Sequence, residues 1–157
     1  MDTYDPEMAE RVWNRVRGKA EAPPAAPSTQ GLLSLIAEEM QDATTYLHLS
    51  RGYQGKEGAL LRKLSQEEQA HAACLKGIYT LITGNRPEVR AVPPKQESAE
   101  IILRRCYGRE MRCLNEYENR SKDPEYGQVF ARLAIQEREH CRQILELLGS
   151  IGQKKKR

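Results

Sequence analysis

Residues 68–71 read EQAH and residues 137–140 read EREH, so a glutamate is followed three positions later by a histidine at two places in the chain. On a helix, residues three apart lie on the same face, and each motif can therefore direct a carboxylate and an imidazole to one point. A single ExxH motif is weak evidence for a metal site. Its recurrence in two helical segments, which takes up two of the three histidines in the 157-residue sequence, is much stronger evidence.

Both motifs lie on apolar helical faces. Apolar residues occupy the positions seven and four before each motif's glutamate, namely Leu61, Leu64, Phe130 and Leu133. A carboxylate that faces a protein core is costly unless it is neutralised, and a pair of divalent metal ions neutralises several carboxylates at once. The pattern therefore predicts two further anionic ligands from other helices.

Glu39 and Glu110 are the predicted further ligands, because each holds the same place in an internal repeat. A tyrosine follows each of them by seven residues, at Tyr46 and Tyr117. The glutamate of the ExxH motif then follows after 29 residues in the first half and 27 in the second. This regularity favours Glu110 over the glutamates at 116 and 118.

The predicted site takes one glutamate from each of two helices and an ExxH motif from each of two others. Its residues are Glu39, Glu68, His71, Glu110, Glu137 and His140. This is the ligand set of carboxylate-bridged di-iron and di-manganese bundles. Four carboxylates and two neutral imidazoles balance two divalent ions, and oxygen with nitrogen ligands suits iron or manganese. We therefore expect two iron ions as cofactors, with manganese as the alternative.

The hydrophobic periodicity predicts an all-α, ferritin-like four-helix bundle. Helices are expected over residues 31–51, 56–83, 98–120 and 124–148, with glycine or proline at their ends. The connection at 85–97 contains three prolines and, when extended, reaches about 43 Å, which is enough to run the length of the second helix. One long crossover between the second and third helices is typical of ferritin-like bundles.

The remaining segments predict extensions around one domain. Residues 6–17 are amphipathic and predict a short N-terminal helix that docks on the bundle, on a neighbouring subunit or on another partner, and residues 18–30 form a Pro/Ala-rich linker. The predicted divisions are an extension at 1–30, the bundle at 31–149 and a basic tail at 150–157. The tail carries four positive charges, so the rest of the chain, with 21 basic and 22 acidic residues, is nearly neutral, and no nucleic-acid binding is expected.

The sequence lacks the features of a membrane or exported protein. No apolar run reaches the roughly 18 residues of a membrane span, and the N-terminus lacks a signal peptide's pattern. We therefore expect a cytoplasmic protein. Its four cysteines lie in helical patterns without a CxxC pair, and they predict buried thiols rather than disulfides or a zinc site.

Over residues 31–149 the chain resembles the rubrerythrin-like branch of the ferritin-like superfamily, through the six-residue pattern given above. The resemblance implies a peroxidase or oxidase that reduces hydrogen peroxide or dioxygen at the di-metal centre. No rubredoxin-type four-cysteine site occurs in the sequence, so electrons are expected from an external donor such as a rubredoxin-type protein. The resemblance also implies a homo-oligomer, commonly a dimer. The alternatives are a ferroxidase that handles iron and a non-catalytic metal-binding interaction module.

The resemblance also implies roles for individual residues. Glu39 and Glu110 would be terminal or shifting ligands, the glutamates of the ExxH motifs bridging ligands, and each histidine a ligand of one metal. Tyr46 and Tyr117 would hydrogen-bond the ligand carboxylates, although core filling is an equally good interpretation. At Cys113, rubrerythrins typically have an additional glutamate, and we expect this thiol to pack near the metals.

Two polar residues near the first predicted ligand are interpreted as surface residues. Asp42, three residues after Glu39, is expected to be exposed, with orientation of a ligand histidine as the alternative. His48 has no glutamate three residues before it and is expected to be solvated.

Overall fold

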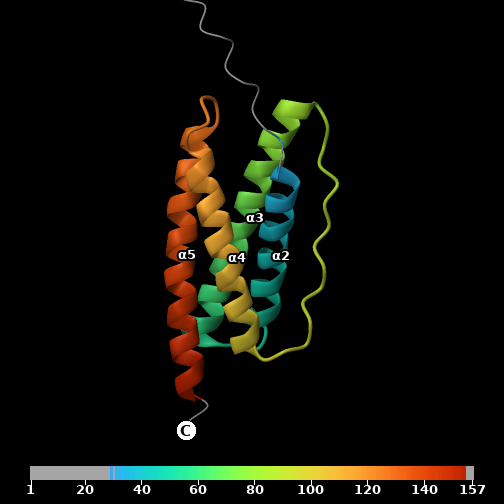
Figure 1. The fold of residues 1–157 in the computed structure, drawn as a ribbon. Coiled ribbons are helices and arrows are strands. Elements are labelled where there is room, and N and C mark those ends of the chain that lie inside the picture. Colours follow the sequence, from blue (N-terminus) through green and yellow to red (C-terminus); the bar gives the residue numbers. More distant parts are fainter. Residues whose placement is uncertain (1–28, 30, 155–157) are drawn as a thin grey trace, which may run out of the picture.

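The computed structural model describes residue 29 and residues 31–154 (Figure 1). Its helices are α2 (Leu32–Ser50), α3 (Gly55–Thr83), α4 (Ala99–Arg120) and α5 (Gly127–Lys154), and the described residues contain no strand. The expected all-α, four-helix architecture is therefore confirmed. The predicted N-terminal helix at 6–17 and most of the linker at 18–30 lie outside the described residues.

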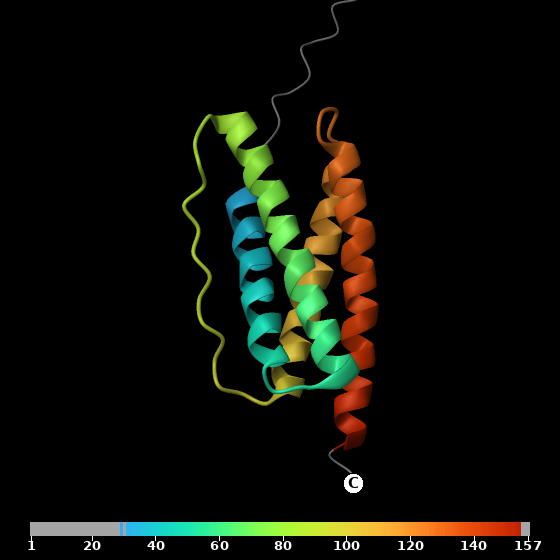
Figure 2. The ribbon, with the colours of Figure 1, turned by 180° about the vertical axis from the view of Figure 1, so that it is seen from behind.

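The four helices form two antiparallel pairs that lie side by side. α2 packs mainly on α3 and α4 mainly on α5, while α2 also contacts α4 and α3 contacts α5. The crossover at 84–98 runs along the outside of the bundle from the end of α3 to the start of α4, as both views show (Figures 1 and 2). α3 and α4 therefore run in the same direction. None of the described helices is long and apolar enough to cross a membrane.

A side-chain amide fixes the crossover against α2. The Nε2 of Gln41 donates to the carbonyl oxygen of Val92 at 2.9 Å, and its Oε1 accepts from the backbone N–H of Val92 at 3.0 Å. These paired bonds satisfy both backbone polar groups of a residue that has no neighbouring strand. The long connection therefore follows one path along the bundle rather than hanging free at this point.

The buried apolar residues form two clusters. One contains Leu75, Tyr117 and Phe130, and the other contains Tyr46 and Leu103 together with residues of all four helices. On every helix the buried acidic or histidine residues lie in sequence between the members of the two clusters. The bundle therefore has a polar centre enclosed by apolar side chains on both sides.

Helix α5 begins later than the sequence analysis predicted. The Oδ1 of Asp123 accepts the N–H groups of residues 125 and 126 at 2.9 and 2.7 Å, and the helix begins at Gly127 rather than Pro124. A Cβ on Gly127 would lie 2.5 Å from the backbone oxygen of Ser121. The α4–α5 turn therefore needs the aspartate cap and a glycine at the first residue of α5.

Helix α5 also ends later, at Lys154 rather than near residue 148. Ile151 is 4% exposed and belongs to the apolar cluster around Tyr46. The Oγ of Ser150 donates to Glu57 of α3 at 2.5 Å. Because these contacts stabilise another turn, Gly149 does not end the helix, and part of the predicted basic tail belongs to the bundle.

The α2–α3 turn leads to a prediction about packing. A Cβ on Gly58 would lie 2.2 Å from the backbone oxygen of Tyr53, whereas one on Gly77 of the same helix would meet nothing within 4 Å. We expect Gly58→Ala to lower the free energy of unfolding by about 1–3 kcal/mol. Gly77→Ala, the matched control, should raise it by up to about 1 kcal/mol through helix propensity. Urea unfolding measures both, and equal effects at the two positions would contradict the close approach.

Candidate metal centre

The structure brings all six predicted ligands together in the middle of the bundle. Each of them is at most 2% exposed. One ligand atom from each of Glu68, His71, Glu137 and His140 can be chosen so that the four lie within 4.8 Å of one another. The other two carboxylates, Glu39 and Glu110, flank this group from α2 and α4. The four helices thus contribute to one buried cluster.

The first half of the cluster surrounds the Nδ1 of His71. This nitrogen lies 2.7 Å from Oε1 of Glu137, 3.3 Å from Oε2 of Glu68 and 3.4 Å from Oε2 of Glu39. The three carboxylates come from three different helices. One nitrogen and three oxygens therefore converge on one side of the centre.

The second half repeats this arrangement around the Nδ1 of His140. This nitrogen lies 2.7 Å from Oε1 of Glu68, and 3.5 Å from both Oε2 of Glu137 and Oε2 of Glu110. Glu68 and Glu137 therefore place one oxygen toward each histidine, whereas Glu110 serves only this half. Two carboxylates thus face both histidines, and each half has one further carboxylate that faces only its own histidine. This arrangement is typical of a site for a carboxylate-bridged pair of ions.

The residues of this cluster fit a pair of cations. While Nδ1 of each histidine carries no proton, five buried polar atoms here have no hydrogen-bond partner: Oε1 of Glu68, both carboxylate oxygens of Glu137, and the Nδ1 atoms of the two histidines. Leaving a buried polar atom unpaired costs about 1–3 kcal/mol. Divalent ions between the two halves would satisfy all five, and a set of four carboxylates and two imidazoles suits iron or manganese.

Protons balance the charges when no metal is bound. Burial, together with Glu110 and Glu39, raises the pKa of Glu68 well above its ordinary value. Although burial disfavours a charged imidazole, hydrogen bonds to Glu137, Glu39 and Glu68 raise the pKa of His71 to about 12, and a similar set raises the pKa of His140. Near pH 7 both imidazoles of the metal-free protein therefore carry protons, and burial favours the neutral acid at Glu68.

Metal binding at this site should release protons. A histidine binds a metal only as the neutral imidazole and a glutamate binds it as the carboxylate, so the ions must displace the protons of the two histidines and any proton held by the carboxyl groups. We expect about two to three protons to be released per chain at pH 7, and metal affinity to rise with pH. Calorimetric titration with Mn²⁺ in two buffers of different ionisation enthalpy measures this number. An affinity that does not change between pH 6 and 8 would contradict the prediction.

Each of the two tyrosines hydrogen-bonds the candidate ligand that belongs to the other half of the internal repeat. Tyr46 of α2 donates its hydroxyl proton to Oε1 of Glu110 on α4, and Tyr117 of α4 donates to Oε1 of Glu39 on α2. Both side chains are fully buried and also belong to the apolar clusters. Both interpretations in the sequence analysis are thus correct, since each tyrosine packs in the core and orients a candidate ligand.

Each histidine has an outward hydrogen bond that the sequence analysis missed. The Nε2 of His71 lies 3.2 Å from Oε1 of Gln136, and the Nε2 of His140 lies 3.2 Å from Oε2 of Glu67. Both acceptors immediately precede the glutamate of an ExxH motif, on the helix opposite the histidine that they contact. The sequence signal that could have predicted these hydrogen bonds is a side-chain acceptor directly before the glutamate in both motifs. Because Nε2 donates outward, Nδ1 is the nitrogen that can offer its lone pair to a metal once the proton on Nδ1 is displaced.

Asp42 is not exposed, and the expectation for this residue was wrong. It is 3% exposed and accepts hydrogen bonds from Arg109 of α4, with Nε of Arg109 at 2.9 and 3.0 Å from its two oxygens. Its partner is therefore an arginine rather than a ligand histidine. Burial disfavours the charged form of Arg109, but the hydrogen bonds and the charge of Asp42 outweigh it and raise the pKa of Arg109 above its ordinary value. His48 is exposed, as expected.

The thiols behave as packing groups. Cys113 is 3% exposed, its Sγ donates to Oε2 of Glu38 at 3.4 Å, and burial raises the pKa of the thiol. Cys106 is fully buried and its Sγ accepts from Arg109 at 3.2 Å. Cys141 is buried and Cys74 is half-buried. All four are free thiols, and the expectation of burial is correct for three of them.

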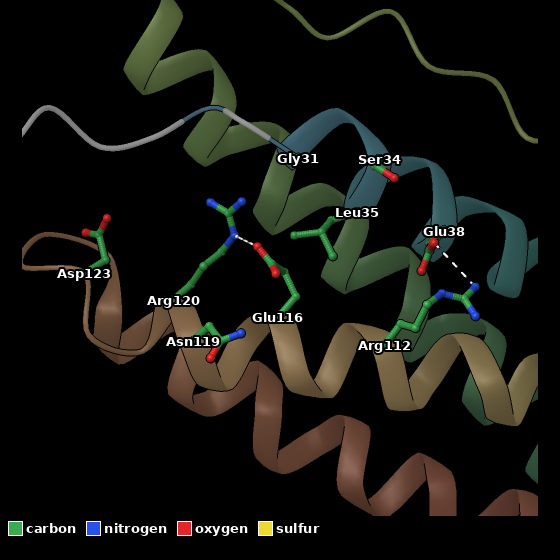
Figure 3. Close-up of a pocket in the computed structure, with 9 residues that line it drawn as sticks. All are labelled: Gly31, Ser34, Leu35, Glu38, Arg112, Glu116, Asn119, Arg120 and Asp123. Carbon is green, nitrogen blue, oxygen red and sulfur yellow. Dashed lines mark hydrogen bonds and ion pairs between the residues drawn. The ribbon is translucent and has the colours of Figure 1, made fainter.

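Two surface pockets lie between pairs of helices. A polar pocket of about 670 Å³ between α2 and α4 is crossed by the ion pairs Glu38–Arg112 and Glu116–Arg120, and none of its lining residues is a candidate ligand (Figure 3). A second pocket of about 520 Å³ between α3 and α5 is lined by His71 together with its acceptor Gln136. The second pocket therefore reaches the edge of the cluster at His71.

Comparison with known proteins adds no further constraint on this site. A scan against protein-family models gives no match, and a search of curated proteins finds no relative. The function is therefore inferred from the geometry and chemistry of the buried Glu/His cluster.

Proposed function

We propose that the chain is a ferritin-like, rubrerythrin-like di-iron oxidoreductase, with manganese as the alternative metal, that reduces hydrogen peroxide or dioxygen with electrons from an external donor. The observation that carries the proposal is the duplicated half-site. Each histidine faces one private carboxylate and two shared carboxylates. A bundle whose buried charges served only for stability has no need of such a duplicated, unsatisfied donor set.

The bound metals would supply the redox chemistry, since two ferrous ions together hold two electrons, enough to reduce hydrogen peroxide to water or dioxygen to hydrogen peroxide when two protons are supplied. The chain's own residues position and protect that chemistry. Glu68 and Glu137 would each hold both ions, while Tyr46 and Tyr117 orient the carboxylates of Glu110 and Glu39. The apolar clusters on both sides exclude bulk water, so reduced oxygen species stay confined.

Protons can be held close to the reacting atoms by this chain. Burial raises the pKa of the Tyr46 and Tyr117 hydroxyls well above their ordinary values, so both remain protonated donors at neutral pH. The pocket that His71 and Gln136 line is the proposed point of entry for small oxidants. The expected electron donor, a rubredoxin-type protein, and the expected homodimer remain predictions of the resemblance.

The test begins with the metal content of the purified protein. We expect two irons per chain by elemental analysis with optical spectroscopy, and their loss in the Glu68→Ala/His140→Ala double variant. The iron-loaded, chemically reduced protein should then consume peroxide faster than the double variant. Absence of metal from both proteins under iron-replete conditions would refute the di-metal proposal and leave a helical interaction module.

The same experiment separates the alternatives that use a metal. A ferroxidase would oxidise many equivalents of added Fe²⁺ per chain with dioxygen and retain the product, whereas a peroxidase turns over peroxide with a recycled reductant. A non-catalytic metal-binding module would hold two ions and consume neither oxidant at a useful rate. Each result assigns the site to one class.

A further inference from the structure

We propose that the two halves of the centre are unequal metal sites, and that the half formed by His140 and Glu110 binds the first ion more tightly than the half formed by His71 and Glu39. The cause is the outward hydrogen bond of each histidine, which ends on the carboxylate of Glu67 in one half and on a neutral amide in the other. This inference rests on the proposed metal centre and concerns how that centre is loaded.

The two hydrogen bonds are geometrically equivalent. Each joins a histidine Nε2 to a side-chain oxygen across the α3–α5 interface, and both distances are 3.2 Å. Glu67 and Gln136 hold the same position relative to the ExxH motif of their own helix. Because distance and register match, the remaining difference between the halves at this position is the charge of the acceptor.

A carboxylate acceptor changes an imidazole more than an amide does. A negative oxygen on the outward N–H increases the electron density of the ring, and the inner nitrogen becomes a stronger metal ligand. His140 receives this effect from Glu67, whereas His71 receives only the dipole of Gln136. A dication at the His140 half therefore also gains an additional anionic charge close to its ligand.

The surroundings of Glu67 limit the size of the effect. The Glu67 side chain is 29% exposed, and Nζ of Lys63 lies 3.5 Å from its other oxygen, Oε1. Water and this ammonium group screen part of the charge. Loss of such an outer hydrogen bond typically costs 10–100-fold in metal affinity, and we expect a difference near the lower limit, about 10-fold.

The first measurement is a calorimetric titration of metal-free protein with Co²⁺. We expect two ions per chain in two steps whose dissociation constants differ by about 10-fold. Crystals grown with one equivalent of Co²⁺ then identify the first site. The anomalous difference map should place the ion beside His140 and Glu110, and neither readout depends on catalytic activity.

Three variants test the cause of the difference. Glu67→Gln gives both halves an amide, so the tighter step should weaken by about 10-fold and the two steps should converge. Gln136→Glu gives both halves a carboxylate, so the weaker step should strengthen. The Glu67→Gln/Gln136→Glu exchange keeps the composition and net charge of wild type, and it should move the first ion to the His71 half.

These positions allow a clear outcome because they lie at the surface. Gln136 is exposed and Glu67 is half-buried, so the substitutions leave the core intact, and circular dichroism of each metal-free variant verifies the fold. Unchanged first-step affinity in Glu67→Gln, or a first ion beside His71 in wild type, would overturn the inference while leaving the two-ion centre in place. Failure of wild type to bind Co²⁺ would overturn the centre itself.

Discussion

Glu68→Gln is expected to abolish the metal-dependent part of the protein's stability while leaving the metal-free protein within about 1 kcal/mol of wild type. Glu68 is 1% exposed, and burial raises its pKa well above its ordinary value, which favours the neutral acid in the metal-free protein. Glutamine has the same shape and the same charge as that protonated acid. In the loaded protein, however, an amide cannot replace the anionic oxygens that face His71 and His140.

Unfolding with and without Mn²⁺ measures both parts of this prediction. At a free ion concentration a thousand times a site's dissociation constant, wild type should gain about 4 kcal/mol for the ion at that site, because the native state alone holds the ions. The Glu68→Gln variant should gain little. Glu139→Gln is the matched control, since Glu139 lies within the second motif but is exposed and paired with Arg142. If Glu68→Gln retained the full gain, Glu68 would not bridge the ions.

The sequence predicted the four helices and the six-residue cluster because both depend on periodicity within one helix. Leu61 and Leu64 lie on the face that carries Glu68, and the structure buries all three. The internal repeat then selected Glu110, which lies 3.5 Å from Nδ1 of His140. Such information is local, so spacing along one helix is enough to predict it.

Most of the features that were missed depend on contacts between helices. Asp42 was interpreted as a surface residue because nothing within α2 marks it as buried, and its partner Arg109 comes from α4. The outward acceptors of the histidines likewise cross from α3 to α5. The limits of α5 depend on a turn and on Ile151, which packs against residues distant in sequence. Periodicity within a helix does not indicate which residue of another helix a polar side chain contacts.

The missed pair Asp42–Arg109 leads to the second large prediction. Arg109→Met is expected to lower the free energy of unfolding by about 3–5 kcal/mol, because it leaves the carboxylate of Asp42 buried without its partner. The two side chains are only 4% and 13% exposed, so water cannot replace the guanidinium. Asp42→Asn/Arg109→Met, which removes both charges, should recover most of the loss. Arg105→Met, which breaks the exposed pair with Glu97, should have little effect.

The pH dependence of the Arg109→Met variant follows from the same pair. Burial raises the pKa of Asp42 and Arg109 opposes that rise, so loss of Arg109 raises the pKa further. A carboxyl whose pKa is higher in the folded than in the unfolded state stabilises the fold when protonated and loses that stabilisation as the pH rises through the folded pKa. The deficit relative to wild type should therefore be larger at pH 8 than at pH 5. Urea unfolding at both pH values measures it, and a deficit that grew toward acid would show that Asp42 is not the residue left unpaired.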